Sequence, residues 1–109
     1  MSGFFLDAAL IESLIAKARA APRRRSHHNL HTDPAGPAHR MLVAIEPDSY
    51  VRPHCHLDPA KAETIIVLRG RLGTLIFDAA GQVLDARVMA PGADVFGYDL
   101  PPGVFHSIV

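Results

Sequence analysis

The sequence after Arg40 breaks into short apolar segments separated by turn residues, and this pattern limits the fold more than any other feature. The intervening stretches are rich in proline, glycine and aspartate, which favour turns. Many short strands at close spacing are typical of an antiparallel sandwich or barrel. Segment 74–88 also predicts a hairpin, with Gly81 in its turn. The apolar segments are 41–45, 50–52, 64–68, 73–77, 83–89, 94–98 and 104–109.

The residues before this region predict one helix, over 7–21. Asp7 is suited to cap its first turn, and Pro22 is suited to end it. Apolar residues recur at helical spacing and form a single stripe, which we expect to pack against the rest of the protein. The stripe consists of Leu10, Ile11, Leu14, Ile15 and Ala18.

A basic, histidine-rich stretch, 23–40, separates the helix from the predicted strands. Pro34, Gly36 and Pro37 interrupt it, so we expect irregular structure. Loops of this length in compact domains are often functional. We expect residues 1–40, helix and loop together, to pack on a barrel formed by residues 41–109, giving a single domain.

The composition of the chain limits the classes of protein to which it can belong. The chain is 49% hydrophobic with a formal net charge of zero, which supports one modest core and argues against nucleic-acid binding. Its single cysteine, Cys55, excludes an internal disulfide and favours a reducing compartment, so we expect a cytoplasmic protein. The N-terminal stretch makes a poor signal peptide, and no apolar run is long enough to span a membrane.

The stretch 53–70 contains most of the residues that could form a metal site. Because the chain has seven histidines, a His-x-His pair is a weak signal by itself. On a strand, however, His54 and His56 share one face. If the residues between His56 and Glu63 form a turn, Glu63 returns beside the histidines on the neighbouring strand. Imidazole nitrogens and a carboxylate oxygen suit divalent metals, at bond lengths of about 2.0–2.2 Å.

A fourth candidate ligand, His106, lies far along the chain. It follows a turn in which Pro101 and Pro102 stiffen the backbone and Gly103 permits an unusual backbone angle. This turn would fix where the last strand begins. A β-barrel can then bring His106 across from His54 and His56.

Together these residues resemble the two motifs of the cupin superfamily. The first motif, His-x-His, a spacer, Glu, six residues and Gly, is matched by His54, His56, Glu63 and Gly70. The second, Pro-x-Gly, two residues and His, is matched by "PPGVFH", which ends at His106. Two features depart from the pattern. The spacer before Glu63 is longer than usual, and the asparagine that often ends the second motif is absent.

A narrower resemblance rests on "RRRSHHNLH" and "HRMLVAIEPDSYVRPHCH", residues 23–31 and 39–56. These stretches look like those of WbuC-type cupin-fold metalloproteins, which occur among bacterial polysaccharide genes. The resemblance implies a small metal-binding barrel and supplies no reaction.

Alternatives exist at several positions. Asp58 competes with Glu63 as the oxygen ligand, but it lies in a turn where aspartate commonly caps its own backbone, so Glu63 is preferred. Cys55 would face away from the two histidines, and packing is favoured over ligation. Residues 23–25 are either a solvated helix end or an anion site. His28, Asn29 and His31 either line the barrel mouth and orient a ligand, or belong to a loop whose histidines cap local backbone.

We therefore expect a mainly β protein with the cupin double-stranded β-helix, a jelly-roll-like barrel, and one N-terminal helix. One divalent transition metal ion (iron, manganese, nickel, cobalt or zinc) would bind His54, His56, Glu63 and His106. The residues expected to contact a small polar or anionic ligand are Arg25, His28, Asn29, His31, Tyr50 and Arg52.

The first functional hypothesis is a metal-dependent enzyme acting on a small polar or anionic substrate, such as a sugar or sugar acid. The alternatives are a non-catalytic ligand-binding or sensing module, and a structural metal site in a dimer. No catalytic residue is assigned, because cupins share ligands and differ in chemistry. The barrel would lack a usual closing strand, and an open edge invites pairing with another chain, so we expect a homodimer.

Overall fold

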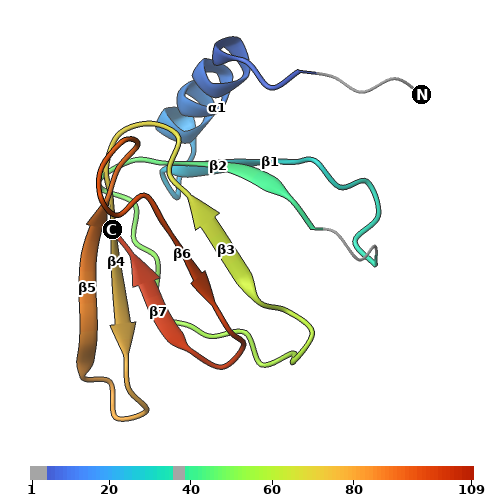
Figure 1. Ribbon diagram of the computed structural model, residues 1–109. Coiled ribbons are helices and arrows are strands. Elements are labelled where there is room, and N and C mark those ends of the chain that lie inside the picture. Colours follow the sequence, from blue (N-terminus) through green and yellow to red (C-terminus); the bar gives the residue numbers. More distant parts are fainter. Residues whose placement is uncertain (1–4, 36–38) are drawn as a thin grey trace. The chain divides into compact units, whose positions relative to one another are not determined.

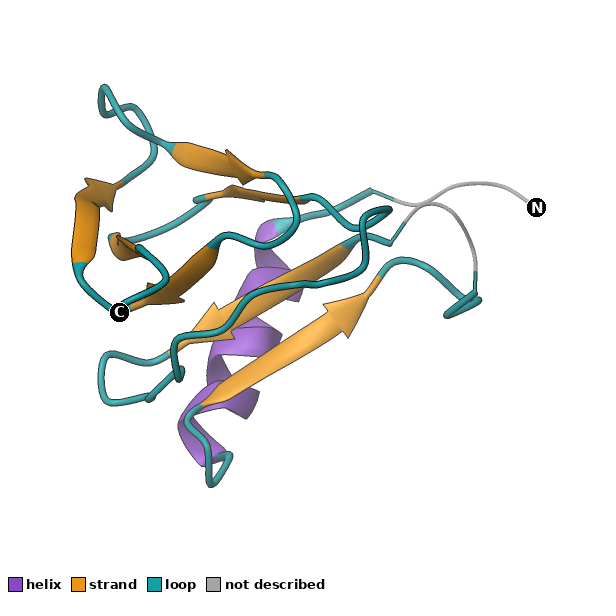
Figure 2. Cartoon of the chain, turned by 90° about the horizontal axis from the view of Figure 1, so that it is seen from below, coloured by secondary structure: helices purple, strands orange, loops and turns teal. Residues whose placement is uncertain are grey.

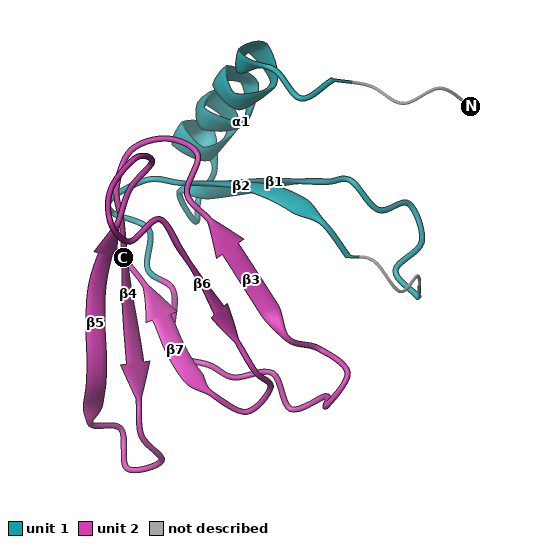
Figure 3. Ribbon diagram, in the orientation of Figure 1, with its two compact units in different colours: residues 1–50 teal, residues 51–109 magenta. Residues whose placement is uncertain are grey.

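A computed structural model describes residues 5–35 and 39–109, which are mainly β with one helix (Figure 1). The chain divides into two compact units, residues 1–50 and 51–109 (Figure 3). The elements are α1 (Ala8–Ala20), β1 (Arg25–Asn29), β2 (Met41–Ile45), β3 (Glu63–Ile66), β4 (Leu72–Phe77), β5 (Val83–Met89), β6 (Gly97–Leu100) and β7 (Phe105–Ile108).

The predicted helix is confirmed as α1. The Asp7 side chain accepts a hydrogen bond from the Leu10 N–H at 3.0 Å, which satisfies one of the free donors of the first turn. Leu14 and Ala18 are buried, and α1 lies along the β1–β2 pair (Figure 2). The Ser26 hydroxyl of β1 also donates to the Leu14 carbonyl oxygen at 2.8 Å. The first unit is thus one helix on a two-stranded sheet.

The stretch expected to be irregular contains a strand, β1. It pairs antiparallel with β2, from Arg25 opposite Ile45 to Asn29 opposite Met41. The sequence of β1 has little strand propensity, but pairing with the apolar β2 provides its backbone with partners and overrides that preference. Residues 36–38 of the expected loop lie outside the described residues. Because β2 pairs with β1, both strands belong to the first compact unit, which ends at Tyr50.

The second unit consists of two antiparallel sheets. One contains β3 and β6, and the other has the order β5–β4–β7 (Figure 1). An isolated bridge between His54 and His106 adds the segment around His54 to the β7 edge. The mainly β expectation is confirmed. The strands of residues 5–35 and 39–109 form separate sheets and no closed barrel, because β3–β6 is not hydrogen-bonded to β5–β4–β7.

Most predicted strands occur, with shifts at their ends. Segments 41–45 and 83–89 match β2 and β5, and Gly81 lies in the β4–β5 turn with φ +86°. The sixth strand is displaced to 97–100, and residues 50–52 form no strand. In β6, Gly97 is needed because a Cβ there would lie 2.3 Å from the Ile65 carbonyl oxygen of β3.

The core of the second unit is small. Val67, Met89 and Leu100 are its buried hydrophobic residues, and Ser107 is buried beside His106 on β7. The Ser107 hydroxyl donates to the Val51 carbonyl oxygen at 2.6 Å, which fixes the segment leading to His54. In the part of the chain that the structure describes, no helix is long and apolar enough to cross a membrane.

Candidate metal centre

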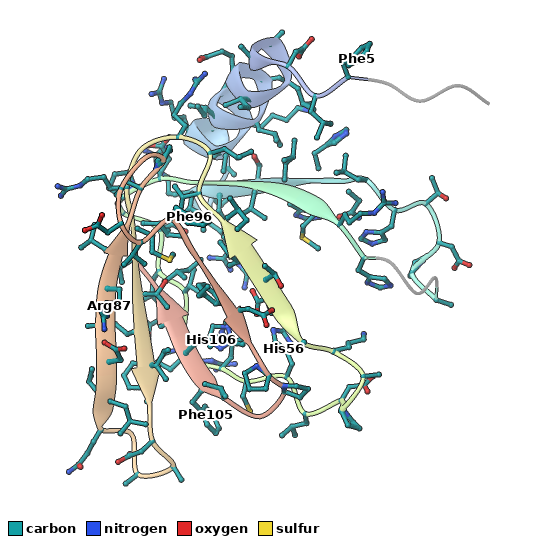
Figure 4. All side chains as sticks on the ribbon, in the orientation of Figure 1. Phe5, His56, Arg87, Phe96, Phe105 and His106 are labelled. Carbon is teal, nitrogen blue, oxygen red and sulfur yellow. The ribbon has the colours of Figure 1, made fainter. Side chains whose placement is uncertain are left out.

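Four side chains of the second unit converge on one point. They are His54, His56, Glu63 and His106, and their potential ligand atoms all lie within 4.8 Å of one another. Two come from the segment after Val51, one from the first residue of β3 and one from β7. His56 and His106 lie near each other in Figure 4. This group can hold a metal ion, as the sequence predicts.

Backbone hydrogen bonds position the three histidines. His54 and His106 exchange N–H···O bonds of 3.0 and 2.9 Å, so both imidazoles lie on the same face, with ring centroids 4.4 Å apart. The Gly103 N–H donates to the His56 carbonyl oxygen at 2.7 Å. Gly103 has φ +86°, a conformation that favours glycine, as the sequence predicts for this turn.

The ring nitrogens are oriented by two carbonyl groups. His54 Nδ1 lies 2.9 Å from the Arg52 carbonyl oxygen, and His106 Nδ1 lies 2.9 Å from that of Val104. A carbonyl oxygen only accepts, so each Nδ1 carries the proton that it donates. In the neutral ring, Nε2 then has a free lone pair, which is the arrangement typical of metal-binding histidines.

The carboxylate of Glu63 lies between two of the rings. Its Oε2 is 2.9 Å from His56 Nε2 and 3.1 Å from His106 Nε2. Although the second distance is short, the buried His106 Nε2 has no hydrogen-bond partner, because the ring is protonated at Nδ1 and a carboxylate oxygen only accepts. A buried lone pair that faces a carboxylate is costly unless a cation lies between them. The arrangement therefore fits a metal ion.

Burial decreases across the group. The side chain of His106 is 2% exposed, that of Glu63 is 29% exposed and that of His56 is 43% exposed. His106 thus forms the closed side of the site and His56 the open side.

Tyr98 of β6 is a fifth member of the site, and sequence reasoning missed it. Its hydroxyl donates to Glu63 Oε1 at 3.3 Å, and its ring centroid lies 6.0 Å from that of His106. Burial, then the charge of Glu63 and the hydrogen bond to it, raise the pKa of Tyr98 above its ordinary value. The phenol therefore stays protonated and can hold Glu63 in place. No motif marks Tyr98, because its position depends on the β3–β6 register.

Asp58 and Cys55, the alternative ligands, do not join the group. Asp58 Oδ1 accepts from the Ala60 N–H at 2.9 Å, so this carboxylate caps its own turn. Cys55 is a half-buried free thiol. The choice of Glu63 as the oxygen donor therefore agrees with the geometry.

The residues expected to contact a ligand lie mostly in the first unit. The Arg25 guanidinium donates to the Tyr50 carbonyl oxygen at 3.0 Å and to the Ser49 hydroxyl at 3.4 Å. The Arg40 N–H donates to His31 Nδ1 at 3.1 Å, and the His31 ring stacks on the ring of His39.

The remaining four differ in exposure. His28 is half-buried on β1, and Asn29, Tyr50 and Arg52 are exposed. Of the six, only Arg52 belongs to the unit that holds the candidate metal centre. Contact between any of these side chains and a ligand stays a prediction.

Comparison with known proteins places the chain in one family. Residues 6–89 match the model of a domain of unknown function, DUF6016. The chain belongs to the DUF6016 family. The matched region contains His54, His56 and Glu63 but ends before Tyr98 and His106. No curated protein matches the chain, and no solved structure matches it. The resemblance to cupins and to WbuC-type proteins therefore stays a prediction.

Proposed function

We propose that this DUF6016 protein binds one divalent transition metal ion through His54, His56, Glu63 and His106, in a cupin-like site. The observation that carries the proposal is the buried Nε2 of His106, which has no hydrogen-bond partner and faces the Glu63 carboxylate. The strand order also supports a jelly-roll arrangement, because the segment at His54 borders β7, which borders β4 and then β5.

Each residue has a distinct role in this proposal. His54 and His106 present Nε2 from rings fixed by carbonyl groups, and Glu63 offsets the charge of the cation. Tyr98 holds the second oxygen of Glu63, which limits the ways this carboxylate can turn. Three imidazoles and one carboxylate form the donor set, which suits iron, manganese, nickel, cobalt or zinc.

We further propose that the site acts on a small polar or anionic molecule, as a metal-dependent enzyme. A bound divalent ion supplies Lewis acidity toward an oxygen-rich substrate. The exposure of His56 and Glu63 favours an open site over a closed structural one. Arg52, two residues before His54, brings positive charge to the same segment and suits a carboxylate or phosphate. A sugar acid fits this chemistry.

Metal analysis of protein purified without a nickel column tests the proposal. We expect about one transition metal ion per chain, since the four residues form a single site. Protein that stays metal-free after incubation with each of the five ions would overturn it.

The cobalt-substituted protein tests whether the site is open. Adding phosphate or acetate should change the visible spectrum if an anion reaches the ion, whereas a closed structural site should give no change. Turnover assays on sugar acids, with and without oxygen, then separate an enzyme from a ligand-binding or sensing module.

A further inference from the structure

The outer edge of the second unit is an exposed strand, β5. It pairs with β4 on one side, and on its other side no strand of residues 5–35 or 39–109 pairs with it. Residues 83–88 of β5 are all exposed, including Leu84 at 67% and Val88 at 61%. A long apolar edge with free backbone groups is a ready template for pairing with another chain.

Backbone geometry shows which groups face this edge. Gly73 exchanges both of its backbone hydrogen bonds with Val109, so the neighbouring Thr74 directs its backbone groups to β5. Thr74 lies opposite Arg87, so Arg87 faces β4 and the adjacent Ala86 faces outward. The Ala86 N–H donates to the Asp85 side chain, which is consistent with a donor that β4 does not use.

The sequence of β5, "VLDARVM", is self-complementary about Ala86. When two copies pair antiparallel with Ala86 opposite Ala86, Asp85 of each lies opposite Arg87 of the other. Leu84 likewise lies opposite Val88. In this register the outward backbone groups of Ala86 are the ones that form a hydrogen-bonded pair. Opposite charges and apolar pairs directly across two strands both stabilise a sheet.

We propose that two copies of the chain dimerise through β5, antiparallel and with Ala86 on the two-fold axis. The two three-stranded sheets would join into one of six strands, an isologous contact. The charge pattern selects a second copy over an unrelated strand, because one strand supplies both partners of each ion pair. This inference is independent of the metal site.

The dimer should be weak. Asp85 already accepts from Arg87 and from the Ala86 N–H within one chain, at 3.1 and 2.9 Å, and these bonds must exchange on pairing. A contact of one strand is also smaller than a standard interface. We therefore expect a dissociation constant on the order of micromolar.

Sedimentation velocity over roughly a hundredfold concentration range around micromolar tests the proposal. The wild-type chain should shift from monomer to dimer. In a dimer of R87D or of D85R, positions 85 and 87 carry like charges and face each other across both symmetric contacts. Each variant should therefore dimerise at least about tenfold more weakly. The double variant D85R/R87D restores both opposite pairs and should dimerise like the wild type.

A mixture of the two single variants is the sharpest test of the register. One carries two arginines and the other two aspartates at positions 85 and 87, so a mixed dimer has both complementary pairs. The mixture should dimerise where each variant alone does not. Within one chain, D85R and R87D both lose the exposed pair between these positions, and such a loss alone costs little.

Ala86→Pro tests the backbone part of the contact. Proline removes an N–H that β4 does not use, so the sheet can survive, as circular dichroism will check, while dimerisation is lost. If this variant does not fold, the charge variants still decide the matter. A wild-type chain that stays monomeric, an R87D dimer of unchanged strength, or a mixture without recovery would each overturn the proposal.

Discussion

His54 and His106 exchange two backbone hydrogen bonds, although they lie far apart in the sequence. This pairing fixes the two imidazoles beside each other before any metal binds. Each ring is also held by a carbonyl group at Nδ1, which leaves both Nε2 atoms for the site. A site preorganised in this way should lose little conformational freedom on binding a metal.

The first prediction concerns the ligands. Replacing His54, His56 or His106 with alanine removes one donor, so each variant should bind metal more than about a hundredfold more weakly. Elemental analysis and competition with a chromogenic chelator measure this. H27A is the matched control, because His27 is exposed on β1. Equal metal loss in H27A would show that the site is misplaced.

Gly103 should matter to the site more than its lack of a side chain suggests. G103A adds backbone strain of about 1–2 kcal/mol at φ +86°, with no atom within 4 Å of the new Cβ. We expect lower thermal stability and weaker metal binding, since Gly103 bonds to the backbone of His56.

Gly81 supplies the control for this variant. It also has φ +86° and open space where a Cβ would lie, but it belongs to the β4–β5 turn. G81A should lower stability by a similar amount and leave metal affinity unchanged. Equal effects of both variants on metal affinity would mean that Gly103 acts through global stability alone.

Tyr98 should act by positioning Glu63. Y98F removes the hydroxyl that donates to Glu63 Oε1 and should weaken metal binding about tenfold, the effect typical of a residue that orients a ligand. T64V is the control, because the Thr64 hydroxyl donates to Asp99 in the same strand pair, away from the site. The cobalt spectrum should change in Y98F and not in T64V. If Y98F binds metal as tightly as the wild type, Tyr98 has no positioning role.

The raised pKa of Tyr98 predicts how stability depends on pH in metal-free protein. Burial and the negative Glu63 favour the neutral phenol in the folded chain, so its pKa there is above the unfolded value of 10.0. The neutral phenol therefore contributes fully to the free energy of unfolding below pH 10.0. This contribution is lost as the pH rises above that value, because the unfolded chain then releases the proton first. The free energy of unfolding, measured with urea, should fall more steeply with rising alkaline pH in the wild type than in Y98F. Identical curves would contradict this.

The ligand residues could be predicted because they lie in short patterns. The His-x-His spacing places two side chains on one face, and the turn before His106 has its own proline and glycine signature. The helix could be predicted for the same reason, since capping and apolar periodicity are local properties.

Features that depend on pairing between distant segments could not be read in this way. Strand β1 exists because β2 lies beside it, and its own residues favour a loop. Tyr98 reaches Glu63 only through the β3–β6 register. The outward direction of the Ala86 backbone likewise follows from a bond between Gly73 and Val109. Local sequence does not determine register between strands far apart in the chain.

The last prediction separates the two arginines expected to bind an anion. The Arg25 guanidinium already donates to the backbone at Tyr50 and to Ser49, so R25A should lower the stability of the first unit by about 1 kcal/mol. Arg52 is exposed and lies in the unit that holds the candidate metal centre, so R52A should weaken phosphate binding to the cobalt-substituted protein about tenfold.

Arg71 provides the control for R52A. It is exposed in the same unit, in the turn before β4, so R71A makes the same change in net charge. Phosphate affinity, followed by the cobalt spectrum, should fall in R52A and stay near the wild-type value in R71A. A general electrostatic effect would lower phosphate affinity equally in both variants. This result would exclude Arg52 as a specific contact. Loss of phosphate binding in R25A with unchanged stability would instead assign the anion to Arg25.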